Sequence, residues 1–415
     1  MSPLGIVILI VLIDLMGFSL VMPLLGPFAE QYGFAGWQIG LLFAAFPICQ
    51  LFAGPVLGRL SDRYGRRPLL VYSQAGTALS FLILGLSRDF RIMLLARMLD
   101  GASGGNILVA QAYVADVTAP EHRARSMGLI GMAFGIGFVL GPLLGGLLAD
   151  LPVHADWRLR LPFLVAAAFS TLAWVVVLLK LPESRPGDAT KVREARVISR
   201  RGIADTIRLP GVGSLVLIAF FTILAWAIFE GTFAIFLQRR MGWGASGAAY
   251  AFAGAGLLSA MVQGGMIRSL VPKYGEIKLI LAGCVLSAIG FAWVAAISGA
   301  SLWPLVGALI FFSIGSGLMS PSISGLLSRI TPMSEQGAVF GTLSSTQTLA
   351  RIISYMAGNV LLAKVSPSAP YWFAAAIYGL VLLAGLKFAP KLAAILARSQ
   401  ETAAEPGTVE VGEPA

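Results

Sequence analysis

The feature that most constrains this chain is a series of long apolar runs joined by short polar loops. A helix that crosses a bilayer needs about 20 apolar residues, and its backbone polar groups must be hydrogen-bonded within the segment because lipid offers no partners. We place twelve such runs near residues 4–27, 38–58, 69–87, 92–116, 126–149, 160–181, 211–237, 246–267, 278–298, 302–327, 337–363 and 370–390. Their number and length predict an all-α membrane protein with twelve transmembrane helices.

Composition supports a membrane protein and excludes several other classes. Of the 415 residues, 57% are apolar and only 12% are charged, whereas soluble domains carry about 25% charged residues. So few charges cannot cover the surface of a soluble protein, which excludes a soluble enzyme, a disordered chain and a disulfide-rich secreted module. Cys49 and Cys284 both fall inside apolar runs without metal-ligand spacing, so we expect two buried thiols and no metal site.

The basic residues predict the orientation in the membrane. A net charge of +10 would suggest a nucleic-acid partner in a soluble protein, but here Lys and Arg cluster in the short loops, so we expect none. With the N-terminus inside, the inside loops and tail hold 21 of the 30 basic residues and the outside loops hold seven, while Arg97 and Arg351 lie within runs. Both termini are therefore expected in the cytoplasm. No Lys or Arg precedes the first run, so we expect it to be retained rather than cleaved.

Two features divide the chain into halves. The longest polar stretch, 182–210, follows the sixth run and contains a basic cluster formed by Lys191, Arg193, Arg196, Arg200 and Arg201. In addition, TAPEHRARSMG at 118–128 is echoed by TPMSEQGAVFG at 331–341, and Arg-Tyr-Gly at 63–65 is echoed by Lys-Tyr-Gly at 273–275. We expect pseudo-symmetric six-helix halves at 1–181 and 211–398, joined by a cytoplasmic loop at 182–210 that can include a short amphipathic helix. The acidic tail at 399–415 is expected to be disordered.

A charged motif lies between the second and third runs. Its members are Gly58, Asp62, Arg63, Gly65, Arg66 and Arg67. Gly58 permits close helix packing, Gly65 permits a tight turn, and Asp62 can pair with an arginine or cap a helix. Such a cluster can act as a conformational latch that closes the cytoplasmic side in one state. The alternative is an ordinary solvated, positively charged inside loop.

This motif and the twelve runs resemble the major facilitator superfamily, which carries G-x-x-x-D-R-x-G-R-R between its second and third spans. Within that family the chain is most similar to bacterial drug/proton antiporters of the tetracycline-efflux type. The residues that suggest this are Asp14-Leu-Met-Gly17 with Met22-Pro23, and Tyr113-Val-Ala-Asp-Val-Thr118. The resemblance implies alternating access, a small-molecule substrate, coupling to protons and a bacterial cytoplasmic (inner) membrane, multi-pass location. We expect a monomer embedded in the lipid bilayer.

The fifth run carries a glycine-rich pattern that resembles the family's antiporter motif. Its members are Gly137, Gly141, Pro142, Gly145 and Gly146. Glycines four residues apart lie on one helix face, so a neighbouring backbone can approach closely, and Pro142 can bend the helix. Generic packing of small residues is the alternative. The resemblance, rather than the spacing, favours export over import.

Five charged residues lie inside the runs, where each costs at least about 2.5–3.5 kcal/mol and must be paired, hydrated or functional. They are Asp14, Arg97, Asp100, Glu230 and Arg351. The runs contain three carboxylates but only two guanidiniums, so at least one carboxylate lacks a cationic partner of its own. Burial favours the neutral form of such a carboxylate. We assign proton coupling to Asp14, tuned by Arg97 and Asp100. Alternatively, Asp14 pairs with Arg97 as a structural contact. Glu230 either pairs with Arg351 or binds a cationic substrate.

The sequence constrains the substrate class less than it constrains the fold. Tetracycline exporters carry an acid midway along the third span, where this chain has Ser80, which argues against tetracycline itself. Aromatic side chains could line a cavity for flat hydrophobic drugs or face lipid; they are Phe43, Phe46, Phe52, Phe134, Phe138, Trp226, Phe229, Phe233, Phe311 and Phe312.

Rival functions are a proton-coupled transporter of a metabolite such as a sugar, amino acid or lipid, and a membrane enzyme. The sequence has no P-loop, no H-E-x-x-H and no G-x-S-x-G, and its two histidines, His122 and His154, fall on opposite sides of the membrane. We therefore expect no enzyme activity, no cofactor and energy from an ion gradient.

Overall fold

The computed structural model describes residues 2–184 and 202–404, and these residues form helices without any strand. The N-terminal half contains α1 (Pro3–Gln31), α2 (Gly36–Tyr64), α3 (Arg66–Leu86), α4 (Phe90–Ser103), α5 (Asn106–Val117), α6 (Arg123–Ala149) and α8 (Leu161–Lys180). The C-terminal half contains α10 (Val212–Met241), α11 (Ala245–Met261), the π-helical turn η3 (Val262–Met266), α12 (Ile267–Tyr274), α13 (Glu276–Ala296), α14 (Leu302–Ile330), α15 (Gln336–Lys364) and α16 (Ala369–Ala404). Short helices η1 (Pro120–His122), α7 (Ala155–Arg158) and α9 (Ile203–Ile207) lie in loops.

Each of the twelve predicted runs corresponds to a helical span in the described part of the chain. Eleven of these spans are long and apolar enough to cross a membrane. The remaining helix, α15, has 29 residues, but its first half contains a polar stretch from Ser344 to Thr348 and then Arg351. Gln347, Thr348 and Arg351 line internal cavities, so the polar residues of α15 lie on an interior surface of the bundle. The structure confirms the predicted all-α, multi-span fold.

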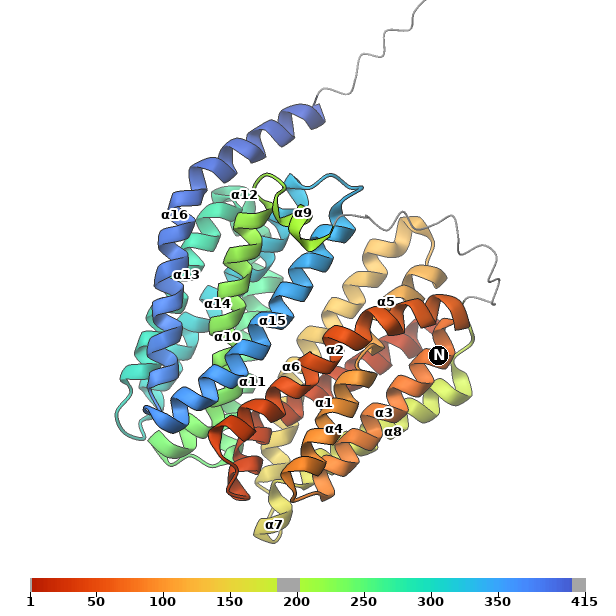
Figure 1. Cartoon of the computed structure of the whole chain (residues 1–415), viewed down its shortest axis with the longest axis vertical. Helices are drawn as coiled ribbons and strands as arrows, with labels where there is room; N and C mark the ends of the chain where they lie inside the picture. The colour runs from red at the N-terminus through yellow and green to blue at the C-terminus, as the bar shows by residue number, and fades with distance from the viewer. Residues whose placement is uncertain (1, 185–201, 405–415) are drawn as a thin grey trace, which may run out of the picture.

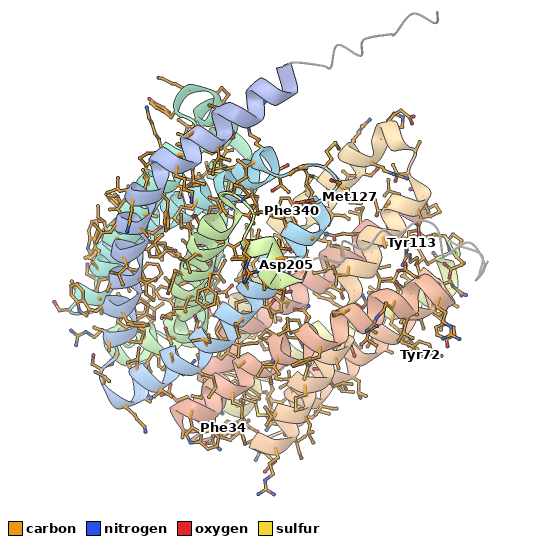
Figure 2. The ribbon with its side chains drawn as sticks, turned by 45° about the horizontal axis from the view of Figure 1, so that its top comes forward. Phe34, Tyr72, Tyr113, Met127, Asp205 and Phe340 are labelled. Carbon is orange, nitrogen blue, oxygen red and sulfur yellow. The ribbon has the colours of Figure 1, made fainter. Side chains whose placement is uncertain are left out.

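The two halves lie side by side, with α1–α8 in red to yellow and α9–α16 in green to blue (Figure 1). They meet along four helix pairs: α1 with α10, α1 with α11, α2 with α15, and α6 with α11. Glycines allow this close approach. A Cβ atom on Gly40 would lie 2.7 Å from the backbone oxygen of Tyr355, and one on Gly256 would lie 3.1 Å from that of Phe138. Side chains on the outer surface, such as Tyr72 (74% exposed), point away from the bundle (Figure 2).

The halves are held together by polar contacts at the end of the bundle opposite the chain termini. Arg239, near the end of α10, forms an ion pair of 2.5 Å with Glu30, near the end of α1. Tyr250 in α11 donates a hydrogen bond of 2.8 Å to Asp150, which follows α6. We call this the closed end.

Several boundaries differ from the sequence expectation. The fourth span is interrupted, because α4 ends at Ser103 and α5 begins at Asn106, with Gly104 and Gly105 between them. The last helix continues to Ala404, into the expected disordered tail, since residues such as Ala403 and Ala404 favour helix; residues 405–415 lie outside the described part. The basic cluster of the central loop also lies outside it, and the helix found in the loop's described portion is α9.

Candidate functional site

Two cavities lie between the halves. The larger has a volume of about 1010 Å³ and the smaller about 240 Å³. Phe134, Phe138 and Arg351 belong to both walls, so the two spaces adjoin. The larger cavity is lined by the N-terminal part of α6 and by the portions of α10, α11, α14 and α15 nearer the chain termini. It therefore lies on the side of the bundle away from the closed end.

The larger cavity has two chemically different walls. On the α6 side it presents small and apolar residues, from Gly131 to Leu140. On the opposite side apolar residues alternate with neutral polar side chains, among them Gln263, Ser316, Ser320, Ser324 and Gln347, and with the charged Glu230 and Arg351. Gln263 belongs to the π-helical turn η3, a type of local widening that is frequent at functional sites. Such a cavity fits a molecule with an apolar face and an edge that bears hydrogen-bonding groups.

Asp14 lies in the wall of the smaller cavity and is 9% exposed. Its Oδ2 atom accepts hydrogen bonds from Gln74 Nε2 on α3, at 2.7 Å, and from Asn106 Nδ2 on α5, at 3.0 Å. Among the described residues no Lys, Arg or His lies within ion-pair distance of Asp14, and its Oδ1 atom has no hydrogen-bond partner. Asp14 is thus a buried carboxylate that is held by neutral amides.

Arg97 and Asp100 pair with each other and not with Asp14. Arg97 Nη1 lies 2.9 Å from Asp100 Oδ2, and both side chains are almost fully buried. The guanidinium also donates to the backbone oxygen of Leu42, at 3.3 Å, and lies over the ring of Phe46. The alternative that Asp14 pairs with Arg97 is therefore wrong, because Arg97 already has a carboxylate one turn away on its own helix.

Glu230 and Arg351 form an ion pair inside the C-terminal half, which is the first of the two predicted alternatives for Glu230. Tyr355 donates a hydrogen bond of 2.9 Å to Glu230 Oε2. Glu230 is 7% exposed, and Arg351 faces both cavities. Of the three carboxylates inside the spans, two are thus paired with guanidiniums and Asp14 is not.

The charged motif after α2 forms a network within the N-terminal half. Arg66 lies 2.7 Å from Asp62 and 3.1 Å from Asp116. Glu183 accepts hydrogen bonds from the backbone N–H groups of Arg66 and Arg67, at 2.9 and 3.1 Å, so it caps the start of α3. Gly65 has a φ of 99°, a conformation that favours glycine. The close helix packing expected at Gly58 is wrong, because no described atom lies within 4 Å of its Cβ position. Arg63 is exposed and lies over the Tyr64 ring.

The glycines of α6 pack directly on α1. A Cβ atom on Gly137 would lie 2.8 Å from Leu15, one on Gly141 2.6 Å from the Met16 oxygen, and one on Gly145 3.1 Å from the Leu20 oxygen. Gly146 instead meets the ring of Tyr250 on α11. Pro142 lies inside α6. The close approach expected for Gly137, Gly141 and Gly145 is thus present, and it sets α6 against the helix that carries Asp14.

The predicted aromatic residues separate into three groups. Phe43, Phe46, Phe134, Phe138 and Trp226 line the cavities. Phe229, Phe233 and Phe312 are buried in an aromatic cluster, and Phe311 packs on Trp293. Phe52 is 72% exposed on the outer surface. Ser80 is fully buried and donates a hydrogen bond of 2.7 Å to the Ala96 oxygen, so it joins α3 to α4 and does not line either cavity.

Sequence reasoning missed Gln74, Asn106 and Tyr355. Each is an uncharged polar residue, so counting charges could not single it out. A weak signal existed for two of them: Gln74 interrupts an apolar run, and Asn106 follows a Gly-Gly pair.

Comparisons with known proteins agree with this architecture. The family model described as Major Facilitator Superfamily matches residues 7–297 and 215–409. The chain is 29% identical to the class B tetracycline resistance protein of Escherichia coli, covering 92% of this chain and 95% of that protein. It is 29% identical to multidrug resistance protein 1 of Bacillus subtilis (strain 168), covering 87% and 90%.

Among solved structures, the chain resembles the human organic anion transporter MFSD10 (TETRAN), with a TM-score of 0.65 and 25% identity over 92% of this chain and 98% of that one. The nucleoside transporter NupG, at 14% identity, has a TM-score of 0.75 over 94% and 99%, which shows the shared fold. The chain belongs to the Major Facilitator Superfamily and is a multi-pass membrane transporter of small molecules, not an enzyme.

Proposed function

We propose that this protein exports hydrophobic cationic or zwitterionic drugs from the bacterial cytoplasm in exchange for protons. The observation that carries the proposal is Asp14, a buried carboxylate in a cavity wall whose partners are amides rather than cations. A carboxylate in an apolar environment readily takes up a proton. Because Asp14 shares no ion pair with any described residue, it can change charge without leaving a buried guanidinium unpaired.

The cavity supports alternating access. With the termini in the cytoplasm, as the basic residues predict, the large cavity faces the cytoplasm and the closed end faces outward. A substrate entering from the cytoplasm would reach Asp14 by passing the α6 wall, since Phe134 and Phe138 belong to both cavities. Proton uptake by Asp14 and substrate binding near it would then be mutually exclusive, which is the requirement for exchange.

The lining supports a drug-like substrate. The apolar α6 wall and the cavity aromatics suit flat hydrophobic molecules, while the single unpaired carboxylate suits a positive charge. The named relatives are tetracycline and multidrug resistance proteins. The neutral polar side chains of η3, α14 and α15 also suit a metabolite rich in hydroxyl groups, so a metabolite transporter is the second candidate.

The test uses inverted membrane vesicles with an acidic interior and records proton release when cationic and zwitterionic drugs, tetracycline included, are added. The wild type should release protons with at least one drug, and Asp14→Asn should not. Asp205→Asn, the same change at an exposed position on α9, is the matched control and should behave as wild type. Full proton-coupled activity in Asp14→Asn would remove Asp14 from the mechanism. No release with any drug would favour the metabolite transporter.

A further inference from the structure

Three buried oxygen atoms around Asp14 have no hydrogen-bond partner among the described residues. They are Asp14 Oδ1, Gln74 Oε1 and Asn106 Oδ1. The amide nitrogens of Gln74 and Asn106 both donate to Asp14 Oδ2. Reversing either amide would place its oxygen against a carboxylate oxygen, so Asp14 fixes both orientations. The two amide oxygens therefore point away from the Asp14 carboxylate and need a partner other than it.

Unpaired buried acceptors are costly, at about 1–3 kcal/mol each, and in native structures they point to an unrecognised partner. Gln74 is fully buried and Asn106 is 5% exposed, so bulk water does not compensate them. The site has an excess of acceptors and a shortage of donors. A cation can be coordinated by several such oxygens, whereas an anion or an apolar group would satisfy none of them.

The broken fourth span also brings the backbone groups of two helix ends to this place. The α4 helix ends at Ser103, and Gly104, its C-cap, lies in the wall of the same small cavity as Asp14 and Asn106. The C-terminus of α4 carries a partial negative charge, and the N-terminus of α5, which begins at Asn106, carries a partial positive charge beside it. Interrupted membrane helices whose C-terminal ends face a cavity are a recurring way to bind small cations.

Counting the surrounding charges indicates a monovalent ion. The charged groups that face the small cavity from the neighbouring helices are Arg97 and Asp100 of α4, which neutralise each other, and Arg351 of α15, which pairs with Glu230 of α10. Asp14 therefore leaves one uncompensated negative charge. One monovalent cation balances it, whereas a divalent ion would leave a buried positive charge.

We propose that Asp14, Gln74 and Asn106 form a Na⁺ site in which the ion competes with the coupling proton. This inference deepens the proposed function, because Na⁺ would occupy the carboxylate that carries the proton. The amide oxygens and Asp14 Oδ1 supply hard oxygen ligands, and the adjoining cavity can supply water. Na⁺ bound here would keep Asp14 ionised and so slow drug–proton exchange.

The first test is competition in the vesicle assay of the wild type. NaCl is compared with choline chloride at equal ionic strength, and the concentration of Na⁺ that halves drug-induced proton release is measured at two pH values. Competition at one site predicts that a tenfold rise in proton concentration raises this Na⁺ concentration about tenfold when protons nearly saturate the site. The proposal would be overturned if Na⁺ and choline had equal effects, or if the half-inhibiting concentration of Na⁺ were the same at both pH values.

The second test does not depend on transport. Thermal unfolding of the purified protein in detergent is followed while Na⁺ replaces choline, because an ion that binds the folded state raises the unfolding temperature. Wild type should be stabilised by Na⁺ and Asp14→Asn should not. Gln74→Leu should weaken the response, whereas Gln263→Leu, the same change in the far wall of the large cavity, should keep it.

These two readouts separate the two proposals. Drug-induced proton release that is insensitive to Na⁺, with no Na⁺-dependent stabilisation, refutes the Na⁺ site and leaves proton-coupled efflux intact. Stabilisation by Na⁺ that requires Asp14, without any drug-induced proton release, supports the site and refutes drug/proton exchange. Stabilisation that persists in Asp14→Asn would place Na⁺ elsewhere and overturn this assignment.

Discussion

Gly141→Ala tests whether the contact between α6 and α1 is as tight as the structure indicates. The added Cβ would lie 2.6 Å from the Met16 oxygen and 2.9 Å from the Leu20 nitrogen. The Ser19 hydroxyl lies closer still and could rotate away, but these two are backbone atoms, so a rotamer change cannot relieve the whole clash. Restoring an ordinary contact of 3.4 Å requires the two helices to separate by about 0.8 Å. Forced overpacking of this kind costs about 1–3 kcal/mol.

Gly128→Ala is the matched control on the same helix, because nothing lies within 4 Å of its Cβ position. Replacing glycine by alanine in a helix interior stabilises by roughly 0.5–1 kcal/mol when space is free. Gly141→Ala gains the same helix propensity, so this term cancels and the two variants should differ by the overpacking cost alone, about 1–3 kcal/mol. Reversible unfolding in mixed micelles, titrated with a denaturing detergent, measures this difference.

The same change should also reduce transport, since α1 carries Asp14 and any displacement of α1 moves it relative to Gln74 and Asn106. Drug-induced proton release per folded molecule should fall in Gly141→Ala and not in Gly128→Ala. Equal stability of the two variants would refute the close packing of α6 on α1. A destabilised Gly141→Ala with wild-type transport would show that the position of α1 is not critical for coupling.

Three further predictions concern other contacts. Glu230→Gln leaves the Arg351 guanidinium without its carboxylate and should lower the free energy of unfolding by up to about 3 kcal/mol. The loss should be smaller than for a fully buried pair because the Arg351 side chain is 32% exposed. The double variant Glu230→Gln, Arg351→Gln should recover part of this loss in the same unfolding titration. Glu183→Gln removes the negative charge that caps α3 and should lower stability by about 1 kcal/mol, with no loss if the cap is unimportant. Gln263→Leu should raise the half-saturating concentration of hydroxyl-bearing drugs by roughly five- to tenfold and leave apolar cations unaffected, whereas an equal effect on both would argue against a polar wall.

The spans could be predicted from the sequence because the membrane imposes one dominant requirement, a long apolar helix. The break in the fourth span could not be predicted from Gly104 and Gly105, because glycines also occur often inside membrane helices that are not interrupted. Counting charges identified that one carboxylate inside the spans must lack a cationic partner. It could not decide which one, because pairing depends on where Arg97 and Arg351 point, and that is set by packing between helices.

The partners of Asp14 illustrate a further limit. Gln74 and Asn106 come from different helices and lie 60 and 92 residues from Asp14 in the chain. Neutral amides have no charge to balance, so no counting argument in the sequence requires them to meet. Their role follows only from geometry, through the two hydrogen bonds to Asp14 Oδ2 and the two oxygens left without donors.

The two halves carry equivalent ion pairs with the charges exchanged. In each half a glycine with positive φ precedes the first residue of the third helix. That residue is Arg66 in one half, paired with Asp116 near the end of the fourth span, and Glu276 in the other, paired with Arg329 at the end of α14. The sequence repeat stops at the glycine because Arg and Glu do not resemble each other. Both halves keep an ion pair at this position, although the acidic and basic partners are exchanged. What the two halves share is therefore the attachment of the third helix to the fourth span. Such an attachment at the end where the large cavity lies would let each half move as a rigid body in the proposed alternating-access cycle.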